Sequence, residues 1–161
     1  MFRQAKGFTL LELLIVLVIL GITISFTVLS FGLKNPQDEL KEHGQRIAAL
    51  MQLASEESIL LGTELAMQFN NDGYMFLNLK DDNWLEIEKD QIFRQRDLPE
   101  HIKIDVSVEG IIGSDSDIRQ RVYFFSSGEA SPFTLTLSSQ DADARYKVTG
   151  DSQAVITHGD K

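Results

Sequence analysis

The chain has 161 residues, no cysteine and a formal net charge of −9 at pH 7, with 24 acidic side chains against 15 lysines and arginines. This length allows one small domain beside a membrane segment, and the lack of cysteine excludes disulfides. An acidic surface repels nucleic acid and anionic lipid, so the composition argues against a DNA-binding protein.

Near its N-terminus the chain has an apolar run over residues 7–33. Arg3 and Lys6 precede this run, and Glu12 is the one acid within it. A helix over the uncharged residues after Glu12 would be about 32 Å long, enough to cross a bilayer core of about 30 Å. Because the basic residues precede the run, the pattern predicts one membrane-spanning helix with a cytoplasmic amino terminus. A cleaved secretory signal is the alternative, but it would have an apolar region of only about 7–15 residues and an A-x-A-like cleavage site.

Glu12 is unusual, because an acid inside a membrane helix costs on the order of 2.5–3.5 kcal/mol unless it finds a partner. Its place near the start of the run would also let the carboxylate reach the lipid head groups without any further role. The order of a basic leader, then Gly7, Phe8, Thr9, Leu10 and Glu12, then an unbroken apolar helix, resembles the class III signal of type IV pilins and type II secretion pseudopilins.

The resemblance implies processing and assembly roles for three residues. In that family a prepilin peptidase cuts after the glycine and methylates the new amine, which implies cleavage between Gly7 and Phe8 and N-methylation of Phe8. The family's acid pairs with the N-terminal amine of a neighbouring subunit, and Glu12 matches that position. A carboxylate and an ammonium buried in lipid relieve one another only when subunits stack in register, which would make Glu12 an assembly residue.

A second helical segment is predicted from Gln37 to about Leu61. Pro36 lacks an amide proton and clashes with the preceding turn, so a kink or a stop is expected there. Apolar residues then recur at three-, four- and seven-residue steps, which predicts one face packed on the domain that follows. These residues are Leu40, Ile47, Leu50, Met51, Ala54 and Leu61.

Strands are predicted in the rest of the chain. Two alternating runs, 64–69 and 74–79, flank the turn-forming residues 70–73, which indicates a hairpin. Six further short segments are rich in β-branched or aromatic residues, and the tail 159–161 is expected to fray. The six segments are 84–88, 102–108, 121–125, 133–137, 146–149 and 154–157.

A helix followed by many strands predicts an α+β fold, in which a long N-terminal helix packs on a small antiparallel β-sheet or sandwich. We expect a leader peptide over 1–7, a transmembrane and assembly helix over 8–33, its amphipathic second half over 34–61, and a periplasmic β-rich domain over 62–161. The two helical parts form one long helix unless Pro36 interrupts it.

The aromatic strand that begins at Val122, the turn at Gly128 and the apolar strand from Phe133 resemble the ending of H-type minor pseudopilins. The resemblance implies a non-enzymatic minor pseudopilin of the type II secretion system, which assembles near the tip of the periplasmic pseudopilus and drives export of folded proteins. It also implies a bacterial inner-membrane location, with other major and minor pseudopilins, the prepilin peptidase and the inner-membrane secretion platform as partners. Further aromatic and turn residues occur in similar order: Phe69, Gly73, Tyr74, Phe76 and Trp84.

Two other functions stay open at this stage. One is a minor pilin of a type IV pilus, a class in which a basic C-terminal surface can bind DNA; this chain has no arginine cluster near its end. Many type IV pilins also close that region with a disulfide, which a chain without cysteine cannot form. The other is a signal-anchored periplasmic binding module that never polymerises, in which Glu12 would be incidental.

No catalytic residue, metal site or cofactor is predicted. His43, His101 and His158 lie far apart without metal-ligand spacing, and no serine has nucleophile-elbow glycines around it. Asp115 and Asp117 alternate as calcium ligands do, and the major pseudopilin binds calcium in a loop. The later acidic ligands of such a site are missing here, which favours solvated loop acids.

Two further sets of residues have ordinary structural interpretations. Asp141 and Asp143 are predicted to form a polar turn between strands and not a ligand site. An aromatic set could stack bases or sugars, but alternation along the strands predicts that half of its members fill the core. The set comprises Tyr74, Phe76, Trp84, Tyr123, Phe124 and Phe125.

Overall fold

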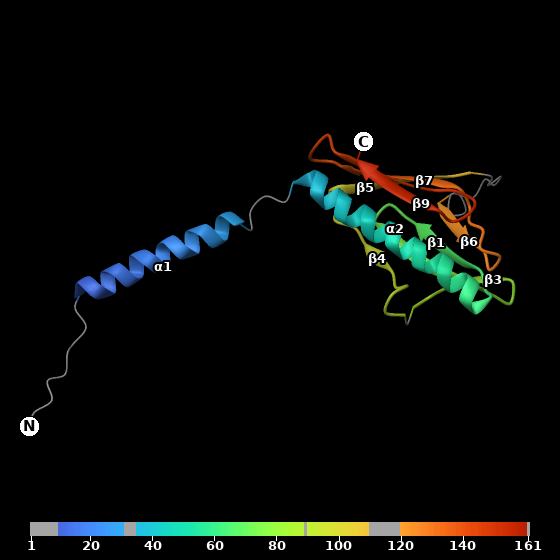
Figure 1. The fold of residues 1–161 in the computed structure, drawn as a ribbon, viewed down its shortest axis with the longest axis horizontal. Coiled ribbons are helices and arrows are strands. Elements are labelled where there is room, and N and C mark those ends of the chain that lie inside the picture. Colours follow the sequence, from blue (N-terminus) through green and yellow to red (C-terminus); the bar gives the residue numbers. More distant parts are fainter. Residues whose placement is uncertain (1–9, 31–34, 89, 110–119, 161) are drawn as a thin grey trace, which may run out of the picture. The chain divides into compact units, whose positions relative to one another are not determined.

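The structure, a computed structural model, describes residues 10–30, 35–88, 90–109 and 120–160 (Figure 1). It divides the chain into two compact units, one ending at Asn35 and the other beginning at Pro36. The predicted helix-then-strands order is confirmed, and the fold is α+β.

The first unit contains the apolar helix α1, Leu10–Ser30, with Glu12 in its first turn. Its described large apolar side chains are exposed, from 43% for Val16 to 82% for Leu10. Among the residues that the structure describes, no helix is both long enough and apolar enough to span a membrane.

The second unit begins with α2, Pro36–Leu61. Proline at the first helical position has the required φ, and its missing amide proton would have had no partner within the helix. The prediction that α1 and α2 form one helix unless Pro36 interrupts it depends on residues 31–34, which lie outside the described part. One face of α2 is buried as predicted, except that Leu61 is 60% exposed, because the helix ends there and Gly62 turns the chain away with φ 63°.

Two antiparallel sheets follow among the described residues. Sheet A has the order β3-β2-β1-β6, with β4 paired to β2. The predicted hairpin is confirmed by its register, in which Met67 pairs with Phe76 and Phe69 with Tyr74. Its strands are β1 (Leu65–Phe69), β2 (Gly73–Lys80), β3 (Asn83–Glu86), β4 (Arg96–Asp97) and β6 (Arg121–Phe124). The two-residue strand β4 was not predicted, because so short a pairing leaves no alternating pattern.

Sheet B has the order β5-β7-β8-β9. Its last strand begins later than predicted, because Ala154 has a φ of 56° and lies in a turn that the carboxylate of Asp151 stabilises by accepting the Val155 N–H at 3.0 Å. The expected fraying of the tail is wrong for Gly159, which pairs with Lys147. The strands are β5 (Ile102–Val108), β7 (Phe133–Ser139), β8 (Arg145–Gly150) and β9 (Ile156–Asp160).

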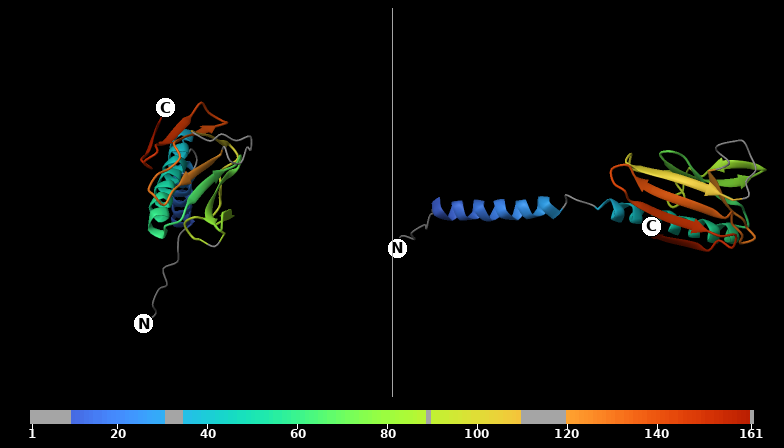
Figure 2. Two further views of the ribbon diagram at one scale, coloured as in Figure 1. Left: turned by 90° about the vertical axis from the view of Figure 1, so that its right-hand side faces the viewer. Right: turned by 90° about the horizontal axis from the view of Figure 1, so that it is seen from above.

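Within this unit α2 packs on β1 and β6 of sheet A and on β7, β8 and β9 of sheet B (Figures 1 and 2). The buried face of the helix and the inward faces of both sheets form one core. The largest fully buried side chains are Tyr146, Phe69, Phe76, Phe124, Leu40, Ile47, Met51, Met67, Leu135, Leu137, Val122 and Val148.

Helix α2 approaches sheet B closely at Gly44. A Cβ atom at this position would overlap the ring of Tyr146, which is 1% exposed and lies on β8. The helix therefore needs glycine here for packing and not for its backbone angles. Farther along α2, the Ser58 hydroxyl shares its proton between the Ser55 carbonyl of the same helix, at 2.8 Å, and the Phe125 carbonyl after β6, at 3.2 Å.

Replacement of Tyr74 by phenylalanine is expected to remove part of the alkaline destabilisation of the protein. Tyr74 is 2% exposed, and desolvation by burial raises the pKa of its hydroxyl above 10.0, although Arg96 and Arg46 lower it. Above pH 10 the unfolded tyrosine loses its proton while the folded one keeps it, so the stability that Tyr74 contributes is lost as pH rises. Urea unfolding at pH 8 and pH 11 should show a smaller loss in the variant; equal losses would contradict this.

Candidate functional site

The residues predicted to act in processing and assembly belong to the N-terminal segment. Gly7 and Phe8 lie outside the described residues. Glu12 lies in the first turn of α1, where the neighbouring described side chains are apolar and exposed. The roles of all three residues remain predictions at this point.

The three histidines belong to different parts of the fold. Among the described residues, no three histidine, aspartate or glutamate side chains form a group that could hold a metal ion. His43 is half-buried on α2, His101 precedes β5, and His158 belongs to β9. Asp115 and Asp117, the pair weighed for calcium, lie outside the described residues.

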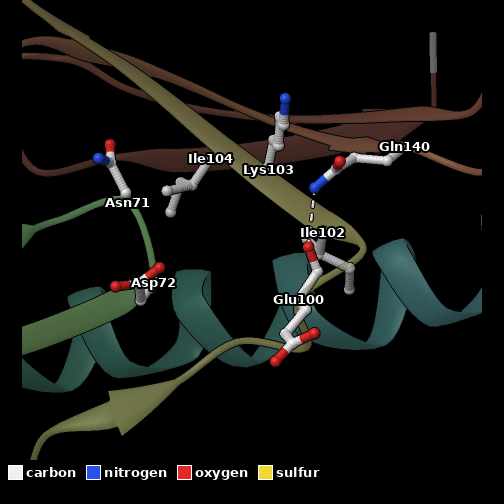
Figure 3. Close-up of a pocket in the computed structure, with 7 residues that line it drawn as sticks. All are labelled: Asn71, Asp72, Glu100, Ile102, Lys103, Ile104 and Gln140. Atoms are coloured by element: carbon white, nitrogen blue, oxygen red, sulfur yellow. Dashed lines mark hydrogen bonds between the residues drawn. The ribbon is translucent and has the colours of Figure 1, made fainter.

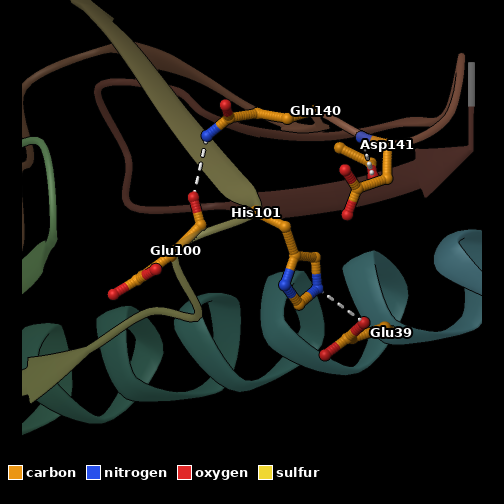
Figure 4. A network of polar contacts seen from close by, with 6 residues as sticks. Glu39, Glu100, His101, Gln140 and Asp141 are labelled. Carbon is orange, nitrogen blue, oxygen red and sulfur yellow. Dashed lines mark hydrogen bonds and ion pairs between the residues drawn. The ribbon is translucent and has the colours of Figure 1, made fainter.

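His101 instead connects two elements of the fold (Figure 4). Its Nε2 atom lies 3.0 Å from Oε2 of Glu39, in the first turn of α2. Gln140 holds the same segment through its side chain, which donates to the Glu100 carbonyl at 2.8 Å, and through its N–H, which donates to the His101 carbonyl at 2.8 Å. With side chains 38% and 22% exposed, the His101–Glu39 pair stabilises the fold by about 1 kcal/mol or less.

A groove lies between the β1–β2 turn and the start of β5 (Figure 3). One part has a volume of about 440 Å³ and a second part about 460 Å³, and both are lined by Asn71, Asp72, Glu100 and Ile102. Lys103 and Glu100 point in opposite directions in this view, and no nucleophile stands beside a base among the lining residues.

Asp141 and Asp143 lie in the turn between β7 and β8, as predicted. Both side chains are exposed, and the Asp141 N–H donates to the Ser139 hydroxyl at 3.2 Å. This arrangement is that of a polar turn.

The predicted division of the aromatic set is confirmed. Tyr74, Phe76 and Phe124 are at most 2% exposed and fill the core. The other three lie on the opposite, outer face of sheet A, where the rings form a row. The Trp84 and Tyr123 centroids are 5.2 Å apart, and those of Tyr123 and Phe125 are 6.4 Å apart with an interplanar angle of 17°.

Arg121 joins this row and was missed by sequence reasoning. Its Cζ atom lies 5.8 Å from the Trp84 ring centroid and 6.0 Å from that of Tyr123. Alternation along β6 would have placed Arg121 and Tyr123 on one face. The contact with Trp84 depends on the positions of β3 and β6 within one sheet. Periodicity along a single strand does not predict the order of the strands.

Comparison with known families gives two matches. The family model of type II transport protein GspH matches residues 43–154, and the prokaryotic N-terminal methylation motif matches residues 2–28. The chain is 33% identical to type II secretion system protein H of Aeromonas hydrophila, covering 89% of this chain and 86% of the relative. It is 30% identical to the protein of the same name from Pseudomonas aeruginosa, covering 89% of this chain and 88% of the relative.

Solved structures have the same fold. The minor pseudopilin EpsH of Vibrio cholerae has a TM-score of 0.62 at 25% identity, covering 76% of this chain and 97% of that chain. Escherichia coli GspH, at 17% identity, has a TM-score of 0.62 and covers 81% of this chain and 94% of that chain, which shows the fold alone. The family match spans most of the domain whose core is described above, so the chain belongs to the GspH family, the minor pseudopilins of type II secretion.

Proposed function

We propose that the chain is a precursor that the prepilin peptidase cuts between Gly7 and Phe8, methylates at Phe8 and releases for assembly near the tip of the pseudopilus. The observation that carries this proposal is the occurrence of two matches in one chain, the methylation motif over 2–28 and the GspH family over 43–154. The first supports processing, and the second supports a place among the minor subunits. The protein acts without catalysis, as a structural part of the secretion machinery.

Before assembly, we place residues 8–33 in the bacterial inner membrane and the β-rich domain, 62–161, in the periplasm. The run of apolar residues supports this location, because α1 exposes apolar side chains around its whole circumference. Such a helix needs lipid or other helices as a covering. In the proposed sequence of events lipid covers it first, and the helices of other pseudopilins replace lipid in the fibre.

Glu12 sets the register in which neighbouring subunits align in the fibre. Its carboxylate pairs with the methylated amine of a neighbouring subunit, and the pair is neutral overall in a medium where a lone charge is unfavourable. A subunit displaced by one position leaves both charges unpaired. The apolar surface supplies adhesion between helices, and the single acid of α1 supplies specificity.

The mass of the N-terminal peptide tests the processing step. In cells that contain a prepilin peptidase, we expect the N-terminal peptide to begin at methylated Phe8, and Gly7→Leu to retain the leader. Gly21→Ala is the matched control, because a Cβ there meets no atom within 4 Å. This control should be processed as the unmodified chain is.

The opposite result would be clear. An intact leader on the unmodified chain, in cells whose peptidase cuts a known substrate, would contradict the proposed processing. The chain would then be an anchored periplasmic module, the alternative weighed from the sequence.

A further inference from the structure

The outer face of sheet A carries a compact group that the assembly role of α1 does not use. We call it the outer cluster and define it as Gln68, Trp84, Arg121, Tyr123 and Phe125. Along β6, Arg121 and Tyr123 alternate with Val122 and Phe124, which are both fully buried in the core. The cluster therefore faces away from the core and from α2.

Arg121 is held in a fixed position within the cluster. Its guanidinium stacks near both the Trp84 and Tyr123 rings, and its Nε and Nη2 atoms donate to Oε1 of Gln68 at 3.2 and 2.5 Å. A guanidinium has five N–H donors, so this neutral amide oxygen leaves several unused. Among the described residues, no carboxylate lies within ion-pair distance of Arg121.

The need to cover apolar side chains of sheet A explains why aromatic rings lie on this face, but it does not explain why Arg121 lies among them. Tyr123 lies opposite Ala66, which lies opposite Leu77, and these two outward-facing side chains are 0% and 6% exposed. Aromatic rings over small aliphatic residues suffice for that burial. Phe125, whose ring stacks on that of Tyr123, nevertheless remains 38% exposed.

We propose that the outer cluster is a docking surface for a neighbouring pseudopilin that presents a carboxylate beside an apolar side chain. Arg121 binds the carboxylate with its planar fork, and Phe125 with the Tyr123 ring covers the apolar group. Charge complementarity selects this occupant, because Arg121 is a preorganised cation that lacks an acid within ion-pair distance among the described residues. Tryptophan, tyrosine and arginine are also the residues that dominate protein interfaces. The inference rests on the proposed function, which supplies the neighbouring subunit.

Nucleic acid fits the same rings less well. Base stacking normally accompanies a basic groove that follows the phosphate backbone, and this chain has a net charge of −9. One arginine among aromatic rings matches a single carboxylate better than a run of phosphates. A protein partner is therefore the occupant to which we commit.

Trp84 provides a direct probe, because it is the only tryptophan in the chain. Full-length protein labelled with 5-fluorotryptophan should give one ¹⁹F resonance, which reports on the outer cluster. The labelled protein, purified in detergent, would be titrated with each other pseudopilin of the same secretion system, purified unlabelled in the same detergent. We expect one of these subunits to shift the resonance in a saturable way.

Substitutions then test the role of the guanidinium. Arg121→Gln should weaken that binding about 30-fold, the loss of a central interface arginine, and Arg121→Lys should weaken it less because the charge remains. Arg145→Gln removes the same charge from an exposed position on β8 and should leave the affinity within about twofold. Phe125→Ser, at an exposed position, should also weaken binding and does not disturb the core.

Several outcomes would overturn the inference. These are the absence of a shift with every pseudopilin, equal affinities for Arg121→Gln and Arg145→Gln, and a shift produced only by a second copy of this chain. The N-terminal mass of the same preparation separates this test from the proposed function. A chain processed at Phe8 that shows no Arg121-dependent shift overturns the docking surface alone.

Discussion

Replacement of Glu12 by glutamine is expected to lower incorporation of the protein into the pseudopilus by a factor of about 100 or more. Glutamine keeps the size of the side chain and removes its charge, which leaves the methylated amine of the neighbour unpaired in an apolar environment. Removing one partner of a buried ion pair costs about 3–5 kcal/mol, and each 1.4 kcal/mol is tenfold in an equilibrium constant. The amount of the protein in sheared pseudopili, measured by quantitative mass spectrometry, gives the result.

The control is a glutamate of α2. Glu57→Gln makes the same chemical change at a half-exposed position of the second unit and should leave incorporation unchanged. Processing at Phe8 and near-ultraviolet circular dichroism should be unaffected in both variants. Normal incorporation and secretion with Glu12→Gln would remove the assembly role and leave the acid of α1 without a function.

Replacement of Gly44 by valine is expected to lower the stability of the second unit, which begins at Pro36, by about 3 kcal/mol, the upper range for overpacking a core. The added atoms would overlap the Tyr146 ring, which is 1% exposed and cannot move into solvent without opening the contact between α2 and β8. For a unit of this size we expect the melting temperature to fall by roughly 10 °C, measured by circular dichroism.

A second site on α2 distinguishes packing from helix propensity. Ala49 is exposed, so Ala49→Val introduces the same β-branched side chain without a neighbour to displace and should cost less than about 1 kcal/mol. Tyr146→Leu replaces the ring by a smaller side chain. In that background Gly44→Val should cost less stability, because residues 44 and 146 are in direct contact. Equal losses from Gly44→Val and Ala49→Val would contradict the close-packing explanation.

Local patterns predicted most of the elements. The period-two runs around residues 70–73 defined the β1–β2 hairpin, and β5 has the bounds that were predicted. The errors occur where tertiary pairing decides the outcome. Gly159 is a poor strand former by propensity, yet it pairs with Lys147 at the edge of sheet B, while Ala154 adopts a positive φ that its side chain does not favour.

Among the candidate sites, those carried by consecutive residues could be recognised in the sequence, and those formed by tertiary contacts could not. For the leader, Phe8 and Glu12, the order of residues along the chain is itself the signal, and their processing and assembly roles stay predictions. The family match supports type II secretion over the type IV pilus alternative. Arg121 was not predicted, because its environment combines β1, β3 and β6. The His101–Glu39 contact was missed for the same reason, since its partners are 62 residues apart in sequence.

The packing of α2 on β8 and β9 has a consequence for biosynthesis. The ribosome makes α2 before any strand, but the last two strands that cover it, β8 and β9, are complete only when translation reaches Gly150 and Asp160. The apolar face of α2 therefore stays exposed until these strands have been synthesised. During this time aggregation competes with folding. A membrane anchor that is inserted early would keep nascent copies apart during this interval, so the domain would complete its folding only after its strands had crossed the bilayer.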